Sequence, residues 1–512
     1  MILDSGLRIA FVSAPGSSLF MEEILAAVAE AARGVATDDV DVVEHRGLVS
    51  DVVDGRTVAV VVPHEYYAVA PPEPTQLGSR VIAFGVEHPG TIEFERSVEH
   101  GRGLGARFEI SQDSVDELAR RSVAATLFPL GYVASWDQWR GAAVDRGVDV
   151  VYLGTADKRR LRLLAGAARA WAGLVTELLI PPHEPMTEAR PDFLLGADKW
   201  RLLARSKVLV NLHRGDKTSL EWVRVLEAMH NGCVVVTEPS QDLGPLRPGV
   251  HLVVAEADHI GDVVAQLVAD APRRRRIAQA AYDLCRNELG TSSAVESLLA
   301  AGRRLNRGAP PDASPEAVAR GAIQGWPGGE RPMAGILPAI HDGPWVEEIP
   351  TATLDRSRSS PARPGDHRLR QLSTPAWGFG EHPGVVRNAL LAQSDEPFIA
   401  VLDEGDEPIG DSLLEMAELL RSDPRLDAAL CFATYGDTLV NVLFPEERRL
   451  RARAYLTRGY VVRRATLEAL GGFTEEPALA GLVDHHFWKS LTAGGGRTAM
   501  LRRVGVALRQ VP

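Results

Sequence analysis

Three charged residues, Glu221, Arg224 and Glu227, stand between a buried apolar run and a glycine turn. Spacings of three and six residues place them near one side of a helix expected over 219–230. A glutamate in such a position can accept hydrogen bonds from both hydroxyls of a ribose, and an arginine can neutralise a diphosphate. The alternative is a solvated helix face held by internal ion pairs.

A polar loop over 213–217 leads into that helix from the strand expected at Val208–Leu212. In open α/β sheets, ligands bind beyond the carboxyl ends of the strands, where helix N-termini favour phosphate. His213 ends its strand and is the histidine best placed to act on such a ligand. A second candidate is Gly154-Thr155, which follows the strand at 148–153 and precedes a basic helix start that includes Arg159; a basic exposed helix is the alternative there.

Acidic residues mark another strand end near the C-terminus. The buried run Phe398–Leu402 is followed by Asp403-Glu-Gly-Asp406, and Asp484 later precedes a segment with Phe487 and Trp488. Carboxylates on a rigid strand end are hard oxygen ligands that hold a divalent cation and its bound diphosphate. These acids therefore predict a metal site.

Alternating strands and helices must position these side chains. Short β-branched runs separated by helical patterns occur over about 1–145 and start again at about 146, which predicts two parallel sheets, each covered on both faces. The division that we expect has four parts: a Rossmann-like domain at 1–145, a second at 146–306, a Pro/Gly/Arg-rich linker at 307–368 and a smaller α/β domain at 369–512. Two apolar pieces within the linker, Ala334–Ile340 and Trp345–Leu354, are candidate strands of the last domain.

Composition excludes several classes of protein. The 512 residues are 45% hydrophobic and carry a net charge of −12, which argues against a protein that coats nucleic acid. No apolar stretch approaches the roughly 20 residues that span a bilayer, and no export signal is visible. Three widely spaced cysteines form neither a disulfide framework nor a zinc site. We expect a cytoplasmic protein of several domains.

The run Leu226–Thr237 resembles the donor-domain signature of GT-B glycosyltransferases, in particular the CgeB-like or glycosyl-transferase-family-1-like group. The resemblance implies two tandem Rossmann-like domains and a metal-independent reaction. It implies that Glu227 holds the ribose of a nucleotide sugar, and that Glu221 or Arg224 faces the donor. In the commonest form of the motif seven residues separate two glutamates, and Ser219 occupies the expected first position here.

By the same resemblance, the loop over 213–217, with Arg214 and Lys217, approaches the diphosphate or the transferred sugar. His213 and Glu221 are then the candidate catalytic residues of this half. Gly154, Thr155 and Arg159 are expected to contribute to donor binding.

The C-terminal motifs are similar to the GT-A fold of family-2 glycosyltransferases. They comprise the acidic strand end at 403–406, a Gly-Gly-Phe turn at 471–473 and Asp484 before an aromatic helix. The resemblance implies Mn²⁺ or Mg²⁺ bound at Asp403 and Asp406, with Asp484 as the base. Gly405 replaces the central carboxylate of the family pattern, which leaves open a degenerate domain that folds without transferring sugar.

The function expected from these patterns is transfer of a sugar from a nucleotide-sugar donor to a hydroxyl acceptor, on a glycan, a lipid-linked sugar, a protein or a metabolite. The chain would be bifunctional if the C-terminal domain is also active. A non-catalytic scaffold or sugar-binding protein made from degenerate transferase domains is the first alternative. An epimerase or another nucleotide-sugar enzyme is the second.

Overall fold

The computed structural model describes residues 6–71, 75–142, 144–215, 218–241, 243–308, 371–374 and 382–509. Lys217 and almost all of the expected linker, including its two candidate strands, lie outside these ranges. The boundaries expected between the domains stay predictions. The α/β class with parallel sheets is confirmed for the first 308 residues, as follows.

The first lobe is built on a six-stranded parallel sheet with the order β2-β1-β3-β4-β5-β6. Its central strands are continuous apolar runs: every residue of β3 is buried, because helices cover both faces of the sheet. The strands are β1 (Leu7–Ser13), β2 (Val40–Arg46), β3 (Thr57–Val61), β4 (Val81–Gly85), β5 (Ala106–Glu109) and β6 (Thr126–Leu127). The helices are α1 (Leu19–Val35), α2 (Val49–Val52), α3 (Pro63–Val69), α4 (Thr75–Gly78), α5 (Ile92–His100) and α6 (Gln112–Arg120).

The second lobe contains a five-stranded parallel sheet with the order β11-β10-β9-β7-β8. Its strands are β7 (Val148–Leu153), β8 (Thr176–Leu179), β9 (Ser206–Asn211), β10 (Val234–Thr237) and β11 (Val253–Val254). The helices that follow them are α7 (Lys158–Ala167), α8 (Gly196–Ala204), α9 (Trp222–His230), α10 (Ile260–Ala269) and α11 (Ala271–Asn287). Because the strands are parallel, their carboxyl ends share one edge of the sheet.

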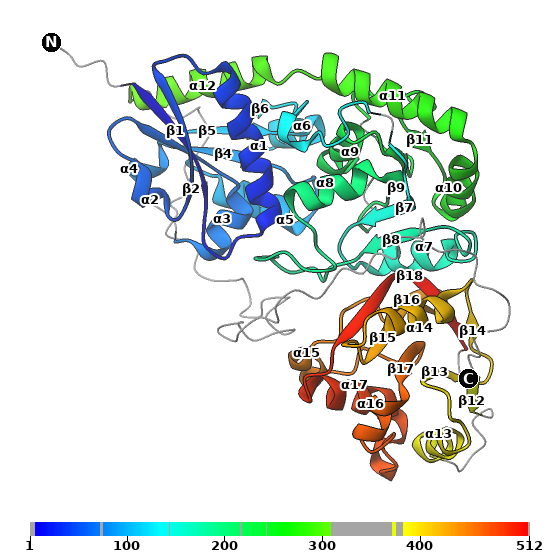
Figure 1. Ribbon diagram of the computed structural model, residues 1–512. Helices are drawn as coiled ribbons and strands as arrows, with labels where there is room; N and C mark the ends of the chain where they lie inside the picture. Colours follow the sequence, from blue (N-terminus) through cyan, green and yellow to red (C-terminus); the bar gives the residue numbers. More distant parts are fainter. Residues whose placement is uncertain are drawn as a thin grey trace.

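The helix α12 (Ser292–Asn306) leaves the second lobe and returns to the first, where it packs along α1, β1 and β3 (Figure 1). Its Val295, Leu298 and Leu299 are buried in the same apolar cluster as Ile9 and Phe11 of β1. The first lobe is therefore completed by a segment that comes after the whole second sheet in the chain.

The C-terminal domain is a mixed sheet with the order β12-β13-β17-β15-β18-β14, and β16 pairs with β15. Its strands are β12 (Gln371–Thr374), β13 (Phe398–Asp403), β14 (Glu407–Pro408), β15 (Ala428–Tyr435), β16 (Thr438–Val440), β17 (Tyr460–Arg463) and β18 (Thr498–Leu508). The helices are α13 (Pro383–Ala392), α14 (Ser412–Ser422), α15 (Glu447–Ala452), α16 (Arg464–Ala469) and α17 (Val483–Ala493). The predicted GT-A fold of this domain stays a prediction.

The C-terminal domain rests on the edge of the second sheet, below β8 and α7 in Figure 1. Ile409, Phe432, Leu439 and Val504 are buried in one apolar cluster with residues of the second lobe. Gly410 fits closely against this surface, because a Cβ there would lie 2.6 Å from the Ala172 carbonyl oxygen. Shared burial of this kind fixes the orientation of the two units.

The helix predicted over 219–230 begins three residues later, at Trp222, and Glu221 is its N-cap. The expectation that three charges share one side of this helix is corrected accordingly. Glu221 and Arg224 approach each other, with 3.8 Å between Oε2 and Nη2, whereas Glu227 contacts Lys199 on α8.

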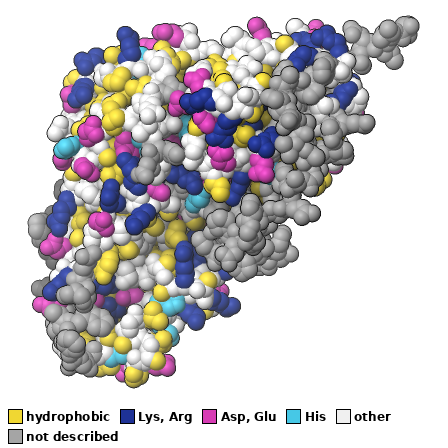
Figure 2. All heavy atoms as spheres, turned by 180° about the vertical axis from the view of Figure 1, so that it is seen from behind, with side chains coloured by type: hydrophobic (Ala, Val, Ile, Leu, Met, Phe, Trp, Pro, Cys, Tyr) yellow, Lys and Arg dark blue, Asp and Glu magenta, His cyan; other side chains and the backbone are white. Residues whose placement is uncertain are grey.

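Seen from behind, the described residues show basic and acidic side chains interspersed over the surface (Figure 2). In the part of the chain that the structure describes, no helix is both long and apolar enough to cross a membrane.

Candidate active site

The strand ends of the second sheet carry a buried polar cluster. Asn211 ends β9 and donates from Nδ2 to Oγ1 of Thr237, which ends β10, at 3.0 Å. Arg224 of α9 donates to Oδ1 of Asn211, also at 3.0 Å. Asn211 and Thr237 are fully buried, so their polar atoms need these partners, and the contacts direct Arg224 toward the carboxyl edge of the sheet.

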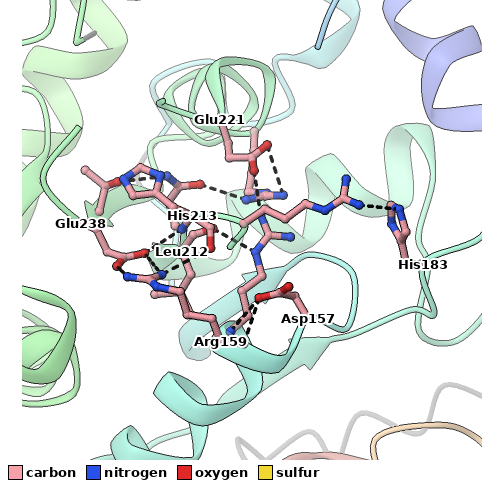
Figure 3. A network of polar contacts seen from close by, with 12 residues as sticks. Asp157, Arg159, His183, Leu212, His213, Glu221 and Glu238 are labelled. Carbon is pink, nitrogen blue, oxygen red and sulfur yellow. Dashed lines mark hydrogen bonds and ion pairs between the residues drawn. The ribbon is translucent and has the colours of Figure 1, made fainter. Parts of the chain in front are cut away.

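Two arginines reach the same edge from the start of α7 (Figure 3). Arg159 forms a bidentate ion pair with Glu238, which follows β10. Arg160 donates from Nε to the Leu212 carbonyl oxygen at 3.1 Å and from Nη2 to Oε1 of Glu221 at 2.7 Å. Four segments of the second lobe therefore meet here.

The N-terminus of α7 is capped from within the chain. The Asp157 carboxylate accepts from the backbone N–H groups of Arg159 and Arg160, at 3.0 and 3.1 Å. A carboxylate thus takes the place at which a phosphate was expected beside Gly154 and Thr155. Gly154 has a different use: a Cβ there would lie 2.7 Å from the Tyr152 hydroxyl, so the glycine makes room for that side chain.

Glu221 is ionised in this setting. Burial alone would raise the pKa of its carboxyl group, but the positive charges of Arg224 and Arg160 outweigh burial and lower the pKa to about 2. Two residues before Glu221, Ser219 donates to Asp113 of α6 at 3.4 Å, so the first lobe approaches the second near the start of α9. The Glu221 carboxylate pairs with both arginines and so orients them at this edge of the sheet.

His213 presents an unpartnered nitrogen. Its backbone N–H donates to Glu238 at 2.7 Å, and Nε2 lies 3.2 Å from the Pro239 carbonyl oxygen. Because a carbonyl only accepts, Nε2 carries the proton and Nδ1 is left as an acceptor. Nδ1 is buried without a partner among the described residues, and burial lowers the pKa of the imidazole, so the ring is neutral at neutral pH.

Arg214 joins the two lobes. Its Nη2 lies 2.7 Å from Nε2 of His183, and its guanidinium pairs with Glu93 on α5 of the first lobe at 3.3 Å. Burial would raise the pKa of Glu93, but the hydrogen bond from His183 and the charge of Arg214 lower it to about 2. Lys217, expected beside Arg214, lies outside the described residues.

Glu227 occupies a separate place, where α1 of the first lobe meets α8 and α9. Its Oε1 lies 2.6 Å from Nζ of Lys199 and accepts from Nε1 of Trp200 at 3.0 Å. Lys199 also binds Glu23 of α1 at 2.6 Å. Glu227 is 2% exposed, so its carboxylate stands at the contact between the lobes but is already engaged by protein groups.

The first lobe adds polar groups at the ends of β3, β4 and β5. His64 Nε2 lies 3.4 Å from Oε1 of Glu87. Glu109 is 1% exposed, and its carboxylate covers Gly85, where a Cβ would lie 2.1 Å from both oxygens. Burial raises the pKa of Glu109 despite the neighbouring charge of Arg107.

The acidic residues of the C-terminal domain do gather, around arginines. Arg387 donates to Asp484 at 2.8 Å and to Asp403 at 3.0 Å. Arg458 lies 3.1 Å from Asp403 and 2.6 Å from Asp406. Asp406 also accepts from two backbone N–H groups, those of 403 and 509, at 2.8 Å each.

This arrangement does not fit a divalent cation. Guanidinium groups already neutralise the carboxylates expected to bind Mn²⁺ or Mg²⁺, and the described residues contain no group of three or more His, Cys, Asp or Glu able to hold a metal ion. Asp484, the expected base, is paired with Arg387 and accepts from the Tyr460 hydroxyl at 3.1 Å. The metal and base roles therefore stay predictions that these contacts oppose.

Of the residues that the sequence singled out, the structure places His213, Glu221, Arg224 and Arg159 at one edge of the second sheet, and Arg214 follows His213 in the chain. Sequence reasoning missed their partners, which come from distant segments: Asn211, Glu238, Glu93, His183 and Arg160. Two of these partners, Asn211 and Glu238, could have been found from their positions in the sequence, because they end or follow neighbouring parallel strands. Glu93 and His183 carry no such signal.

Residues 158–300 match a family model described as "Glycosyl transferase-like". The matched segment lies in the second lobe and its continuation through α11 and α12, and it contains the four arginines of the strand-edge cluster. The resemblance of this lobe to glycosyltransferases is thus confirmed at the level of the family model. The model does not extend to the C-terminal domain.

Solved structures with similar arrangements include AviGT4, a glycosyltransferase involved in avilamycin A biosynthesis, at 16% identity, 60% coverage of this chain, 100% of that chain and a TM-score of 0.40. HepE from Anabaena in complex with UDP-glucose is 12% identical, with 57% of this chain and 99% of that chain covered and a TM-score of 0.39. A glycosyltransferase from Rickettsia africae is 9% identical, with 59% of this chain and 98% of that chain covered and a TM-score of 0.38. These TM-scores are too low to establish a common fold. No curated protein matches the chain.

Proposed function

We propose that the first two lobes transfer a sugar from a nucleotide-sugar donor to a hydroxyl acceptor. One observation carries this proposal: four guanidinium groups and a neutral imidazole meet at the carboxyl edge of a parallel sheet, in a segment that matches a glycosyl transferase-like family. Ligands of open α/β sheets bind at this edge, and the leaving group of such a reaction is a diphosphate.

The arginines would stabilise the departing diphosphate. As the bond between the anomeric carbon and the diphosphate oxygen breaks, negative charge develops on that oxygen. Arg159, Arg214 and Arg224 offer fixed positive charges without a metal ion, so we expect this half to need no cofactor. Glu238, Glu93 and Glu221 hold these arginines in place until the donor competes for them.

We assign proton acceptance to His213. The acceptor oxygen forms a bond to the anomeric carbon and must lose its proton, and Nδ1 of His213 is a neutral, unpartnered acceptor among the described residues. Glu221, ionised and bound to two arginines, is assigned a positioning role. The first lobe, with His88 and Glu87 opposite, would receive the acceptor.

Glu227 remains the proposed ribose ligand. Its carboxylate lies between the lobes, as that role requires, but binding would need Oε1 to exchange Lys199 and Trp200 for the ribose hydroxyls. Replacement by glutamine should weaken nucleotide affinity by about 1–3 kcal/mol. Unchanged affinity for every nucleotide tested would remove Glu227 from the site.

The test is a panel of nucleotide sugars screened for a rise in melting temperature, since a ligand that binds only the native state stabilises it. Positive donors are then incubated with simple hydroxyl acceptors, and release of nucleoside diphosphate is measured. His213→Ala should reduce turnover about 100-fold or more, and the exposed His259→Ala serves as the control. Conversion of the donor without release of diphosphate would favour an epimerase, and no binding by any nucleotide sugar would favour a scaffold.

For the C-terminal domain, we propose a supporting role in place of a second transfer reaction. The observation that favours it is the closed set of contacts among three aspartates and two arginines. A carboxylate in such a set is not free to bind a cation or to accept a proton from a substrate.

A further inference from the structure

The segment 180–195 joins β8 to α8 and touches all three parts of the molecule. At its start, His183 contacts Arg214 and Glu93 of the candidate active site. In its middle, the Met186 carbonyl oxygen accepts from the backbone N–H of Leu19 in the first lobe at 2.9 Å. It therefore runs along the contact between the two lobes, and we refer to it as the bridging segment.

The C-terminal domain holds the bridging segment by charged contacts. Arg449 of α15 donates to Glu184 at 3.0 Å, and Glu446 accepts from Arg190 at 2.7 Å. Arg449 and Glu446 also pair with each other at 3.2 Å, so charges of opposite sign alternate across the interface. Arg449 is 4% exposed, and buried pairs of this kind fix geometry because each partner needs the other.

A second contact lies beside the first. Arg502 of β18 donates to the Pro191 carbonyl oxygen at 2.7 Å and pairs with Glu177 of β8 at 2.7 Å. Arg502 thus ties one end of the bridging segment to the strand that precedes it. Apolar packing around Phe432 and Leu439 also holds the C-terminal domain against the second lobe.

We propose that the C-terminal domain positions the candidate active site by fixing the bridging segment, which in turn holds His183 against Arg214. Arg449 and Arg190 are then positioning residues, since neither contacts the cluster directly. The consequence for catalysis rests on the proposed function, whereas the mechanical coupling does not.

Hydrogen–deuterium exchange of the full chain tests the coupling without any ligand. In Arg449→Met we expect amides of the bridging segment to exchange roughly tenfold faster, and amides near Arg214 to exchange severalfold faster, while β15 keeps its protection. The matched control is Arg451→Met on the same helix, whose side chain is 69% exposed in its pair with Glu447. This control should leave all three regions unchanged.

Two outcomes would overturn the proposal: no faster exchange in the bridging segment than in the control, or faster exchange there with none near Arg214. If amides of β15 also exchange faster in Arg449→Met, the same exchange measurement is made on Arg190→Met, which alters no residue of the C-terminal domain. The same two outcomes in that variant would overturn the proposal. Arg449→Lys should restore much of the protection, because a lysine can still pair with Glu184.

Kinetics separate this inference from the proposed function. With a donor found in the panel, Arg449→Met should raise KM for the donor about three- to tenfold and leave kcat nearly unchanged, as expected when uniform binding is lost. A wild-type protein that turns over no donor contradicts the proposed function and leaves the exchange result valid. An unchanged KM for the donor together with faster exchange near Arg214 would show that the coupling does not affect donor binding.

Discussion

The second sheet and the C-terminal sheet both gather charged side chains at the ends of their strands, yet the two clusters differ in what is left over. In the C-terminal cluster, Asp403, Asp406 and Asp484 are all paired with arginine. At the second sheet, His213 Nδ1 and the Tyr152 hydroxyl are buried without partners among the described residues. Among the described residues, the C-terminal cluster pairs its carboxylates and leaves a donor, Nε of Arg387, without a partner, whereas the second sheet leaves an acceptor, Nδ1 of His213.

The comparison teaches that a strand-end motif identifies where polar groups collect but not whether they are available. Availability is decided by residues from other segments. Arg387 on α13 and Arg458 before β17 close the C-terminal cluster. Four changes, ordered from the largest expected effect to the smallest, would break or sharpen this contrast.

Arg387→Met should cost the C-terminal domain about 3–5 kcal/mol of unfolding free energy, because it leaves buried carboxylates without their counter-charge. The measurement is the urea dependence of alkylation of Cys431, which is fully buried in β15. Arg425→Met, which breaks a pair whose arginine is 61% exposed, is the control and should cost less than about 1 kcal/mol. A small effect of Arg387→Met would show that the cluster is not closed.

Arg159→Met should affect ligand binding more than folding. Its side chain is 26% exposed, so we expect the melting temperature to stay within about 2 °C of the wild type. A charge-assisted contact to the diphosphate is lost, which should weaken donor affinity about 10- to 100-fold. Calorimetry with a donor from the panel measures the affinity, and a large loss of stability with unchanged affinity would make this cluster structural as well.

His230 should make the second lobe sensitive to acid. Burial lowers the pKa of its imidazole to about 4, below the unfolded value near 6.5. The stabilising contribution is therefore complete above about pH 6.5 and is lost as the pH falls through 4, with about 2 kcal/mol gone at pH 5. Urea-dependent alkylation of Cys285, which lies 3.5 Å from His230, measures this loss of stability. In His230→Gln, the stability should depend much less on pH over the same range. The same pH dependence in His230→Gln as in the wild type would contradict this assignment.

Chelation should have no measurable effect. Because arginines neutralise the C-terminal carboxylates and the second sheet relies on guanidinium groups, an excess of EDTA should leave donor binding and transfer unchanged. Manganese should likewise leave the melting temperature of the wild type where it was. A loss of activity on chelation, restored by Mn²⁺, would revive the metal roles of Asp403 and Asp406.

Much of the fold follows from local patterns, and much of the site does not. Continuous runs rich in β-branched residues predicted β7 and β9, because both faces of a parallel sheet are buried. The helix α8 was not predicted, and it is held in part by contacts from another lobe, such as Glu23 with Lys199. The start of α9 was placed three residues early, since Glu221 reads as helical although it is the N-cap.

The site divides in the same way. His213, Arg224 and Arg159 could be proposed from their places after strands or at helix starts. That Asp157 fills the expected phosphate place, or that Arg387 and Asp484 form a pair, depends on side chains that meet only after folding. Residue type and spacing carry no information on such long-range partners.

The return of α12 to the first lobe has a consequence for how the chain can be made and cut. During synthesis, β1 and α1 leave the ribosome long before Val295 and Leu298 arrive to cover them. Until then, the first sheet exposes apolar surface that is prone to aggregate. A fragment that stops at the expected boundary near residue 145 would keep that surface exposed permanently, so the two lobes belong on a single expressed piece that runs through Asn306.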